Sequence, residues 1–394
     1  MLFHRKLTKL LLDQINKKEI VVLTGMRRVG KTTLLRIIYD QIPETNKLFI
    51  DLENPINQKM FSETDYDNIW GNLAPLGITN QKKAFLFIDE IQYLPSIVKA
   101  IKYLFDHFNV KFFITGSSSY YLKNYFPESL SGRKIVFELY QLDFEEFLIF
   151  KNVRHSFKST FLEKNDSRNY IAFEKLKMLY EEFLYFGGFP QVVLSDSQED
   201  KKNQLNDIFT SYFEKDVKTL ADFKQINVFR DLILLLCQRT GSKLDISKLS
   251  SALNVSRNTV YSYLSFLEQT YFFSFITPWS KSVDREISGT KKVFACDTGF
   301  VNLFARVDEG NILENAVYNC IRHFGKVYYY QKRSGVEIDF ILPELDCAIE
   351  VKTKADKRDV IHLENVSKSL GFNNSYVVSR NFINLEKVIS VVDL

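Results

Sequence analysis

A short glycine-rich segment near the start of the chain has the residue types and spacing of a phosphate-binding loop. Residues 25–32 read Gly-Met-Arg-Arg-Val-Gly-Lys-Thr, which matches the pattern Gly-x-x-x-x-Gly-Lys-Ser/Thr. In such a loop the glycines let N–H groups point at phosphate oxygens, the lysine neutralises the β- and γ-phosphates, and the hydroxyl ligates Mg²⁺. We therefore predict binding of ATP with Mg²⁺, the alternative being an ordinary glycine turn. The predicted nucleotide-binding residues are Gly25, Arg28, Gly30, Lys31, Thr32 and Thr33.

Two acidic residues complete the predicted nucleotide site. Asp89 and Glu90 directly follow the apolar run 84–88, Ala-Phe-Leu-Phe-Ile. Asp89 is predicted to hold Mg²⁺ together with Thr32, and Glu90 to activate the attacking water as a general base. An acidic pair can also simply end a strand, but its position downstream of a phosphate-binding loop favours the catalytic interpretation.

Three further polar residues are candidates for the same reaction. Thr115 and Ser117 follow the next apolar run, where either side chain would sense the γ-phosphate or orient the water; the alternative is a serine-rich turn. Arg133 would act as an arginine finger that reaches the γ-phosphate of a neighbouring subunit. The alternative for Arg133 is a surface arginine that precedes a strand.

A second set of charged residues lies near the end of the chain. Asp339 belongs to one apolar run, and Glu350 and Lys352 form Glu-x-Lys in the next one. Because strand side chains alternate, the two residues of Glu-x-Lys share one face. Asp339 and Glu350 would hold Mg²⁺ or Mn²⁺ beside a scissile phosphate, Lys352 would stabilise negative charge, and Glu314 is a possible fourth group. A regulatory or DNA-holding relic would have the same pattern.

Residues 227–275 have the pattern of a winged helix. We predict one helix over 246–253 and a second over 257–269, with Ser256 as its N-cap, followed by a wing strand over 271–275. Helices in this arrangement often contact DNA through the second helix. The candidate DNA contacts are Lys248, Arg257 and Asn258. Winged helices also bind proteins, so that alternative stays open.

The elements that must position these residues follow from the hydrophobic pattern. The first 150 residues alternate short apolar runs with amphipathic segments, which indicates a doubly wound α/β domain with a parallel sheet. The predicted strands are 19–24, 47–52, 84–88, 111–115 and 134–138, and the clearest helices are 32–41 and 94–108. In the last 110 residues we predict a helix over 314–324 and strands over 326–331, 338–342, 348–351 and 376–378.

These patterns predict four domains in an α/β chain. They are a doubly wound α/β domain over residues 1–142, a helical subdomain over 143–223, a winged helix over 224–283 and a second α/β domain over 284–394. The boundaries lack glycine-, proline- or serine-rich linkers.

Composition limits the remaining possibilities. The 394 residues include 52 basic and 48 acidic side chains, so the net charge of +4 neither requires nor excludes a nucleic-acid partner. The four cysteines form no Cys-x-x-Cys motif or Cys/His cluster, which argues against a zinc site or a disulfide framework. No signal peptide or transmembrane run is evident, so we expect a cytoplasmic protein without membrane contact.

Several motifs together resemble a family of prokaryotic AAA-type ATPases over nearly the whole chain. They are GMRRVGKTTLL, FLFIDEIQYLP, FITGSSS, LSGR, FGGFP, YFEKDV, LENAVYN, SGVEIDFI and IEVK. The resemblance implies ATPase activity. It implies that residues 1–142 are an AAA+ ATPase core, 143–223 a helical lid, 224–283 a winged helix and 284–394 a restriction-endonuclease-like domain. It also implies that Gly188 and Pro190 belong to a Gly-x-Pro lid motif that approaches the nucleotide. The carboxylates near the end of the chain resemble the PD-(D/E)xK nuclease core.

The leading hypothesis is an ATPase that acts on DNA and uses Asp339, Glu350 and Lys352 in a nuclease-like domain, whose activity we leave open. The rival hypothesis is an ATP-gated switch that binds a regulatory protein, with the nuclease-like domain inactive. A component of a toxin–antitoxin or defence system is a third possibility. A homo-oligomer is also considered, because AAA modules often form rings.

Overall fold

The computed structural model describes residues 3–116, 130, 132–218, 225–332 and 335–394. These residues form two compact units. The first contains Met1–Tyr140, Ser211–Asp222 and Gln269–Tyr271, and the second contains Gln141–Thr210, Phe223–Glu268 and Phe272–Leu394. Each unit is described by itself below.

The first unit is built on a parallel five-stranded sheet with the strand order β2-β3-β4-β1-β5. Its strands are β1 (Ile20–Thr24), β2 (Lys47–Asp51), β3 (Ala84–Asp89), β4 (Val110–Gly116) and β5 (Lys134–Glu138). Its helices are α1 (Leu7–Leu12), α2 (Lys31–Gln41), α3 (Pro55–Lys59), α4 (Asn68–Leu73) and α5 (Ile97–His107), with a π-helix, η3, at Tyr212–Val217. The predicted α/β class and parallel core are confirmed.

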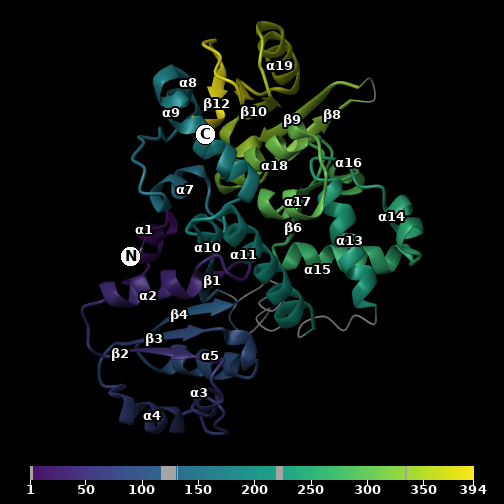
Figure 1. Ribbon diagram of the computed structural model, residues 1–394. Coiled ribbons are helices and arrows are strands. Elements are labelled where there is room, and N and C mark those ends of the chain that lie inside the picture. Colours follow the sequence, from purple (N-terminus) through teal and green to yellow (C-terminus); the bar gives the residue numbers. More distant parts are fainter. Residues whose placement is uncertain (1–2, 117–129, 131, 219–224, 333–334) are drawn as a thin grey trace. The chain divides into compact units, whose positions relative to one another are not determined.

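Helices cover both faces of this sheet because its central strands carry apolar side chains on both faces (Figure 1). On one face, Phe87 of β3 packs against Tyr39 of α2 with ring centroids 5.3 Å apart. On the other face, Ile88 joins a buried core that includes Ile101 and Leu104 of α5. The carboxyl ends of parallel strands lie at one edge, so β1, β3 and β4 end together where the phosphate-binding loop begins.

The second unit contains a helical part, a helix–turn–helix with a β-hairpin, and a separate sheet (Figure 1). The helices before the hairpin are α7 (Phe144–Phe150), α8 (Phe161–Asp166), α9 (Tyr170–Phe186), α10 (Pro190–Val193), α11 (Gln198–Ser211), α13 (Ile226–Gln238), α14 (Ile246–Leu253) and α15 (Arg257–Gln269). The predicted bounds of the last two are confirmed, and the Ser256 hydroxyl caps α15 by accepting a bond from the Thr259 N–H at 3.1 Å.

The hairpin joins β6 (Phe273–Ile276) and β7 (Lys292–Ala295), which pair antiparallel around α16 (Val283–Ser288). Helices α17 (Thr298–Phe304) and α18 (Glu309–Ile321) follow it. Sequence patterns did not predict β7 or the short helices α16 and α17.

The separate sheet has the order β12-β11-β10-β9-β8 and is parallel from β10 to β12 and antiparallel from β10 to β8. Its strands are β8 (Tyr328–Gln331), β9 (Glu337–Leu342), β10 (Cys347–Lys352), β11 (Asn374–Ser379) and β12 (Val388–Ser390), and α19 (Lys357–Leu370) packs on it. The four strands predicted here are confirmed, whereas β12 was missed.

Candidate active sites

The phosphate-binding loop connects the end of β1 to the start of α2. Gly25 has a φ of +148°, and a Cβ built on it would lie 2.1 Å from the carbonyl oxygen of Leu139, so only glycine fits this position. Arg28 takes the left-handed conformation with a φ of 67°. The loop therefore turns as tightly as a phosphate cradle requires, directly before the N-terminus of a helix.

Lys31 is buried at the first position of α2, and its side chain bends back over the loop. Its Nζ donates hydrogen bonds to the carbonyl oxygens of Gly25 and Met26, each at 2.9 Å. Burial lowers the pKa of this lysine, and the negative charge of Glu90 opposes that shift. Both of these hydrogen bonds go to neutral carbonyls, which a phosphate oxygen could replace as a stronger partner.

Asp89, Glu90 and Thr115 are brought together at the carboxyl ends of β3 and β4. The Thr115 hydroxyl donates to an Asp89 carboxylate oxygen and accepts a bond from the Glu90 N–H at 3.0 Å. Burial raises the pKa of Asp89, and the Thr115 and Thr32 side chains are close enough to oppose that rise. Glu90 has a φ of 56°, a strained conformation for a residue other than glycine. The predicted Mg²⁺ pair and the predicted base thus lie beside one threonine.

An arginine of the loop makes a contact that sequence reasoning missed. Arg27 Nε lies 2.8 Å from Oδ2 of Asp216, and the two side chains are only 12% and 2% exposed. Asp216 belongs to the π-helix η3, more than 180 residues away in the sequence. Inserted π-turns often occur at functional sites. The motif YFEKDV was the available signal, because it contains Asp216, but its role required the tertiary contact.

Two other residues predicted for the nucleotide site are Ser117 and Arg133. Ser117 lies outside the described residues. Arg133 precedes β5, so it lies at the amino edge of the sheet, and its guanidinium binds the Asp106 carboxylate at 2.7 and 3.1 Å. The loop lies at the opposite edge. An action of Arg133 on the nucleotide of another subunit stays a prediction.

Gly188 and Pro190 belong to the second unit, where the glycine pair packs against a buried carboxylate. The Gly188 N–H donates to Asp297 Oδ2 at 2.7 Å, and a Cβ on Gly187 would lie 1.8 Å from Oδ1 of the same residue. Burial raises the pKa of Asp297 to about 6. The motif FGGFP therefore has a packing role within the second unit, and its approach to nucleotide stays a prediction.

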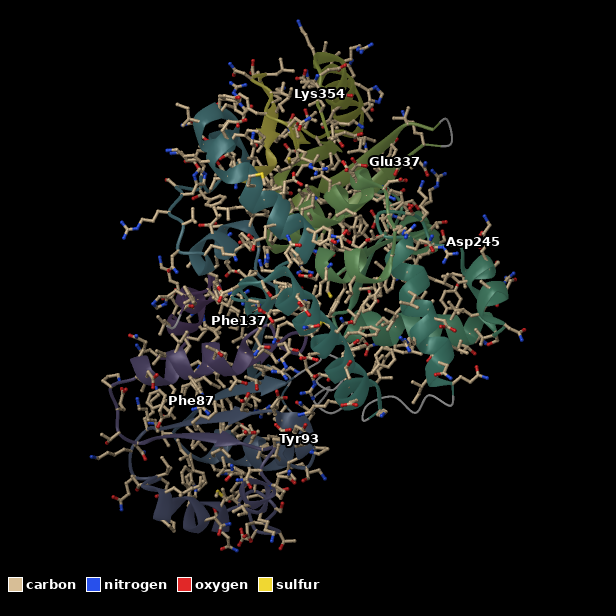
Figure 2. The ribbon with its side chains drawn as sticks, in the orientation of Figure 1. Phe87, Tyr93, Phe137, Asp245, Glu337 and Lys354 are labelled. Carbon is tan, nitrogen blue, oxygen red and sulfur yellow. The ribbon has the colours of Figure 1, made fainter. Side chains whose placement is uncertain are left out.

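The predicted nuclease residues converge in the second unit around a lysine that sequence reasoning missed. Lys292 Nζ lies 2.7 Å from Glu337 Oε1, 3.0 Å from Glu314 Oε1 and 3.8 Å from Asp339 Oδ1. We call Glu314, Glu337, Asp339 and Glu350 the acidic cluster; Glu337 is labelled on β9 in Figure 2. Burial alone would lower the pKa of Lys292, but the carboxylates around it raise that pKa.

Lys352, the remaining predicted nuclease residue, pairs with Glu350. Its Nζ lies 2.7 Å from Glu350 Oε1, as expected for two residues on one face of β10. Asp339 accepts a hydrogen bond from the Val351 N–H at 2.8 Å, which ties β9 to β10. Burial raises the pKa of both Asp339 and Glu350.

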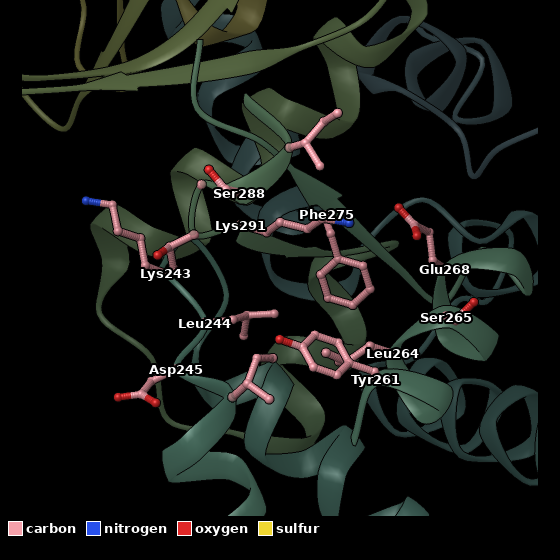
Figure 3. A pocket seen from close by; sticks show the side chains of 14 residues that line it. Lys243, Leu244, Asp245, Tyr261, Leu264, Ser265, Glu268, Phe275, Ser288 and Lys291 are labelled. Carbon is pink, nitrogen blue, oxygen red and sulfur yellow. The ribbon is translucent and has the colours of Figure 1, made fainter. Parts of the chain in front are cut away.

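The predicted DNA contacts lie on the surface of the second unit. Lys248 on α14 and Arg257 and Asn258 at the start of α15 are all exposed. Beside the other end of α15 is a pocket of about 790 Å³. In Figure 3 the rings of Tyr261 and Phe275 face this pocket, whose other walls come from residues 243–246 and 287–291. Its lining is mixed, with two lysines and two carboxylates.

The described part of the chain lacks two features. No helix there is both long enough and apolar enough to cross a membrane. The same residues contain no group of three or more histidine, cysteine, aspartate or glutamate side chains arranged to hold a metal ion.

Comparison with known families divides the chain into three matched segments. Residues 17–148 match an AAA domain. Residues 177–311 match a domain of unknown function (DUF8612), and residues 309–394 match another (DUF4143). The matched AAA segment contains the phosphate-binding loop, Asp89, Glu90 and Thr115.

Solved structures are similar only at low levels. The Walker-type ATPase PABY2304 of Pyrococcus abyssi is 13% identical with a TM-score of 0.45, covering 77% of this chain and 96% of that one. The Thermotoga maritima RuvB branch migration motor is 19% identical with a TM-score of 0.32, covering 70% of this chain and 90% of that one.

Whole-length relatives are closer in sequence. An uncharacterized protein of Haemophilus influenzae is 28% identical, over 95% of this chain and 93% of that protein. The uncharacterized protein MJ1544 of Methanocaldococcus jannaschii is 30% identical, over 90% of this chain and 80% of that protein. The chain therefore belongs to the family of MJ1544, and its N-terminal part is an AAA-type domain.

Proposed function

We propose that the first unit binds ATP with Mg²⁺ and hydrolyses the γ-phosphate at the carboxyl edge of its sheet. The observation that carries this proposal is the convergence of Lys31, Asp89, Glu90 and Thr115 at that edge. They come from the start of α2 and the ends of β3 and β4. Charged and polar groups fixed in advance around the reacting phosphate are the main source of catalysis in phosphoryl transfer.

Each side chain has one role in this proposal. Lys31 exchanges its carbonyl partners for phosphate oxygens, and Thr32 with Asp89 would hold Mg²⁺, whose positive charge neutralises the phosphates. Thr32 and Asp89 fit this ion because they supply a hydroxyl and a carboxylate, and Thr32 is close enough to affect the pKa of Asp89. Glu90 accepts the proton of the attacking water, and Thr115 orients Glu90 through its backbone N–H.

The test is the exchange Glu90→Gln, which keeps the shape of the side chain but removes the base. We expect steady-state ATP hydrolysis to fall by about a hundredfold or more while ATP binding is retained. Glu44→Gln is the matched control, because Glu44 is an exposed glutamate of the same unit. Hydrolysis by Glu90→Gln at the rate of the unmodified protein would contradict the role of Glu90.

A second candidate function is a contact between the second unit and DNA through a winged helix. It is supported by α14, α15 and the β6–β7 hairpin, together with the exposure of Lys248 on α14 and of Arg257 and Asn258 at the start of α15. Phosphate contacts of this kind weaken steeply as salt rises. The rival is an ATP-gated switch that binds a protein partner and ignores DNA.

Duplex DNA separates the two candidates. If the winged helix binds DNA, ATP hydrolysis should rise with DNA at low salt, and Lys248→Ala with Arg257→Ala should remove most of that rise. Lys175→Ala is the control, because Lys175 is exposed on α9, away from these residues in the sequence. A hydrolysis rate that no DNA structure changes, with no DNA binding, favours the switch.

DNA cleavage, which the resemblance to the PD-(D/E)xK core implies, is not part of the proposed function. The arrangement of Lys292 among the carboxylates is the reason, and it leads to a separate inference.

A further inference from the structure

The acidic cluster contains a positive charge supplied by the chain itself. A divalent ion in a nuclease site sits among carboxylate oxygens, which it needs as ligands. Here the Lys292 ammonium is within 3.0 Å of oxygens of Glu314 and Glu337 and within 3.8 Å of one of Asp339. It thus touches three of the four members of the cluster.

The backbone fixes the position of this ammonium. Lys292 is the first residue of β7, where it pairs with Ile276 of β6 and forms a bridge with Lys243 on its other side. Its side chain is only 4% exposed, whereas exposed lysines swing freely through solvent. The ring of Tyr329 lies 5.5 Å from the ammonium and helps to enclose it.

Oxygens of the acidic cluster also have partners other than Lys292. Glu350 pairs with Lys352 at 2.7 Å, and Glu337 has a second lysine, Lys243, at 3.6 Å. One oxygen of Asp339 accepts the Val351 N–H. A divalent ion would therefore have to displace an ammonium from the same oxygens, and two cations repel each other strongly in a buried site.

We propose that the Lys292 ammonium is the resident cation of the acidic cluster and excludes divalent metal ions from it. The nuclease-like fold would then be held together by a lysine at the place where a metal-dependent enzyme binds its ion. The metal ion implied by the resemblance to PD-(D/E)xK nucleases does not fit these residues as they are arranged. This inference does not depend on ATP hydrolysis in the first unit.

The experiment measures Mn²⁺ bound by the full chain, using the electron paramagnetic resonance signal of free Mn²⁺. Every protein carries Asp89→Asn and is kept free of nucleotide, so that the first unit contributes no Mn²⁺ site and the proposed function is not tested. With Lys292 intact, we expect no stoichiometric Mn²⁺ site that depends on Asp339.

The exchange Lys292→Met keeps the length of the side chain and removes its charge. We expect it to increase Mn²⁺ affinity by at least about tenfold, creating one site that Asp339→Asn abolishes. Lys243→Met is the matched control: Lys243 is 29% exposed and pairs with Glu337 alone in the cluster, so its removal should change Mn²⁺ binding little.

Two results would overturn the inference. One is an Mn²⁺ site, abolished by Asp339→Asn, in the chain that retains Lys292. The other is a folded Lys292→Met protein with no added Mn²⁺ site. If Lys292→Met fails to fold, the measurement on the chain with Lys292 still decides, because a metal site there contradicts a resident ammonium.

Discussion

Two buried lysines, one in each unit, have opposite electrostatic surroundings. Lys31 donates to the carbonyl oxygens of Gly25 and Met26, and burial lowers its pKa. Lys292 is surrounded by carboxylates, which raise its pKa despite burial. The charge of Lys292 is already balanced within the fold, while that of Lys31 is directed at neutral groups that an anionic ligand can replace.

A buried lysine can therefore serve either ligand binding or stability, depending on its partners. A lysine whose hydrogen bonds go to carbonyls can exchange these neutral partners for a phosphate. A lysine held by carboxylates is part of a buried ion network. Its removal leaves buried carboxylates without a counter-charge, which destabilises the folded protein. Exchanges of each lysine should therefore affect different properties.

The largest effect is expected from Lys31→Ala. Loss of the charge that faces the phosphates should lower kcat/KM for ATP by about a thousandfold, which corresponds to roughly 4 kcal/mol. The stability of the protein should change little by comparison. Steady-state hydrolysis with Lys82→Ala as control checks this, because Lys82 is an exposed lysine of the same unit. Hydrolysis within threefold of the control would contradict a role of Lys31 in phosphate binding.

The next effect concerns stability and comes from Lys292→Ala. Removing this ammonium leaves Glu314 and Asp339 buried together without their cation, which should cost about 3 kcal/mol or more of unfolding free energy. The more exposed Lys243→Ala should cost less than about 1 kcal/mol. Urea unfolding of both variants measures the two losses of unfolding free energy. Equal losses would contradict a special role of Lys292 in stabilising the buried carboxylates.

A smaller effect is expected from Asp216→Asn. This exchange removes the charge that pairs with the Arg27 side chain of the loop, so we expect kcat to fall about tenfold, or roughly 1.4 kcal/mol. ATP affinity, measured by calorimetry, should change less than kcat. Asp40→Asn, at an exposed position on α2, is the control. An unchanged kcat would mean that η3 does not influence the loop.

The smallest effect concerns a third buried lysine, Lys111. Like Lys31, it donates to carbonyl oxygens. Its Nζ donates to the carbonyl oxygens of Lys17 and Glu19, and burial lowers its pKa to about 8. Because the folded pKa lies below the ordinary value of 10.5, the unfolded chain binds more protons between these two values. The contribution of Lys111 to the free energy of unfolding should therefore rise as the pH increases from about 8 to 10.5.

Comparison of the unmodified protein with Lys111→Met checks this sign. The difference in unfolding free energy should shift in favour of the unmodified protein by about 1 kcal/mol between pH 8 and pH 10. Urea unfolding at several pH values gives that difference, and other titrating groups cancel because both proteins share them. A shift in the opposite direction would mean that Lys111 behaves like Lys292.

Sequence patterns were most successful where the determinants are local. Strand β5 and helices α14 and α15 have the predicted bounds, and β1 to β4 differ from prediction by one or two residues at an end. Apolar runs and caps such as Ser256 depend on neighbours within a few positions. Helices α16 and α17 were missed because six or seven residues make no more than two turns, which is too short to show a helical period. Strand β7 was missed although it is as long as β6.

Part of the proposed nucleotide site could also be predicted from the sequence. The loop pattern and Asp89 with Glu90 sit at strand ends, and parallel strands bring their carboxyl ends to one edge. The contact of Thr115 with both acids follows from the same rule, because β3 and β4 are neighbours. Asp216 could not be placed, because η3 returns to the loop only in the folded chain.

Short-range spacing in the sequence predicts the phosphate-binding loop, its acidic partners and the alternation of strands and helices. The position of Lys292 in the acidic cluster follows from tertiary contacts alone. Its partners come from α18 and β9, and the pairing of β7 with β6 sets where it lies. Electrostatic energy depends on distances in space, so the same residue type became a ligand-facing charge at Lys31 and an internal counter-ion at Lys292.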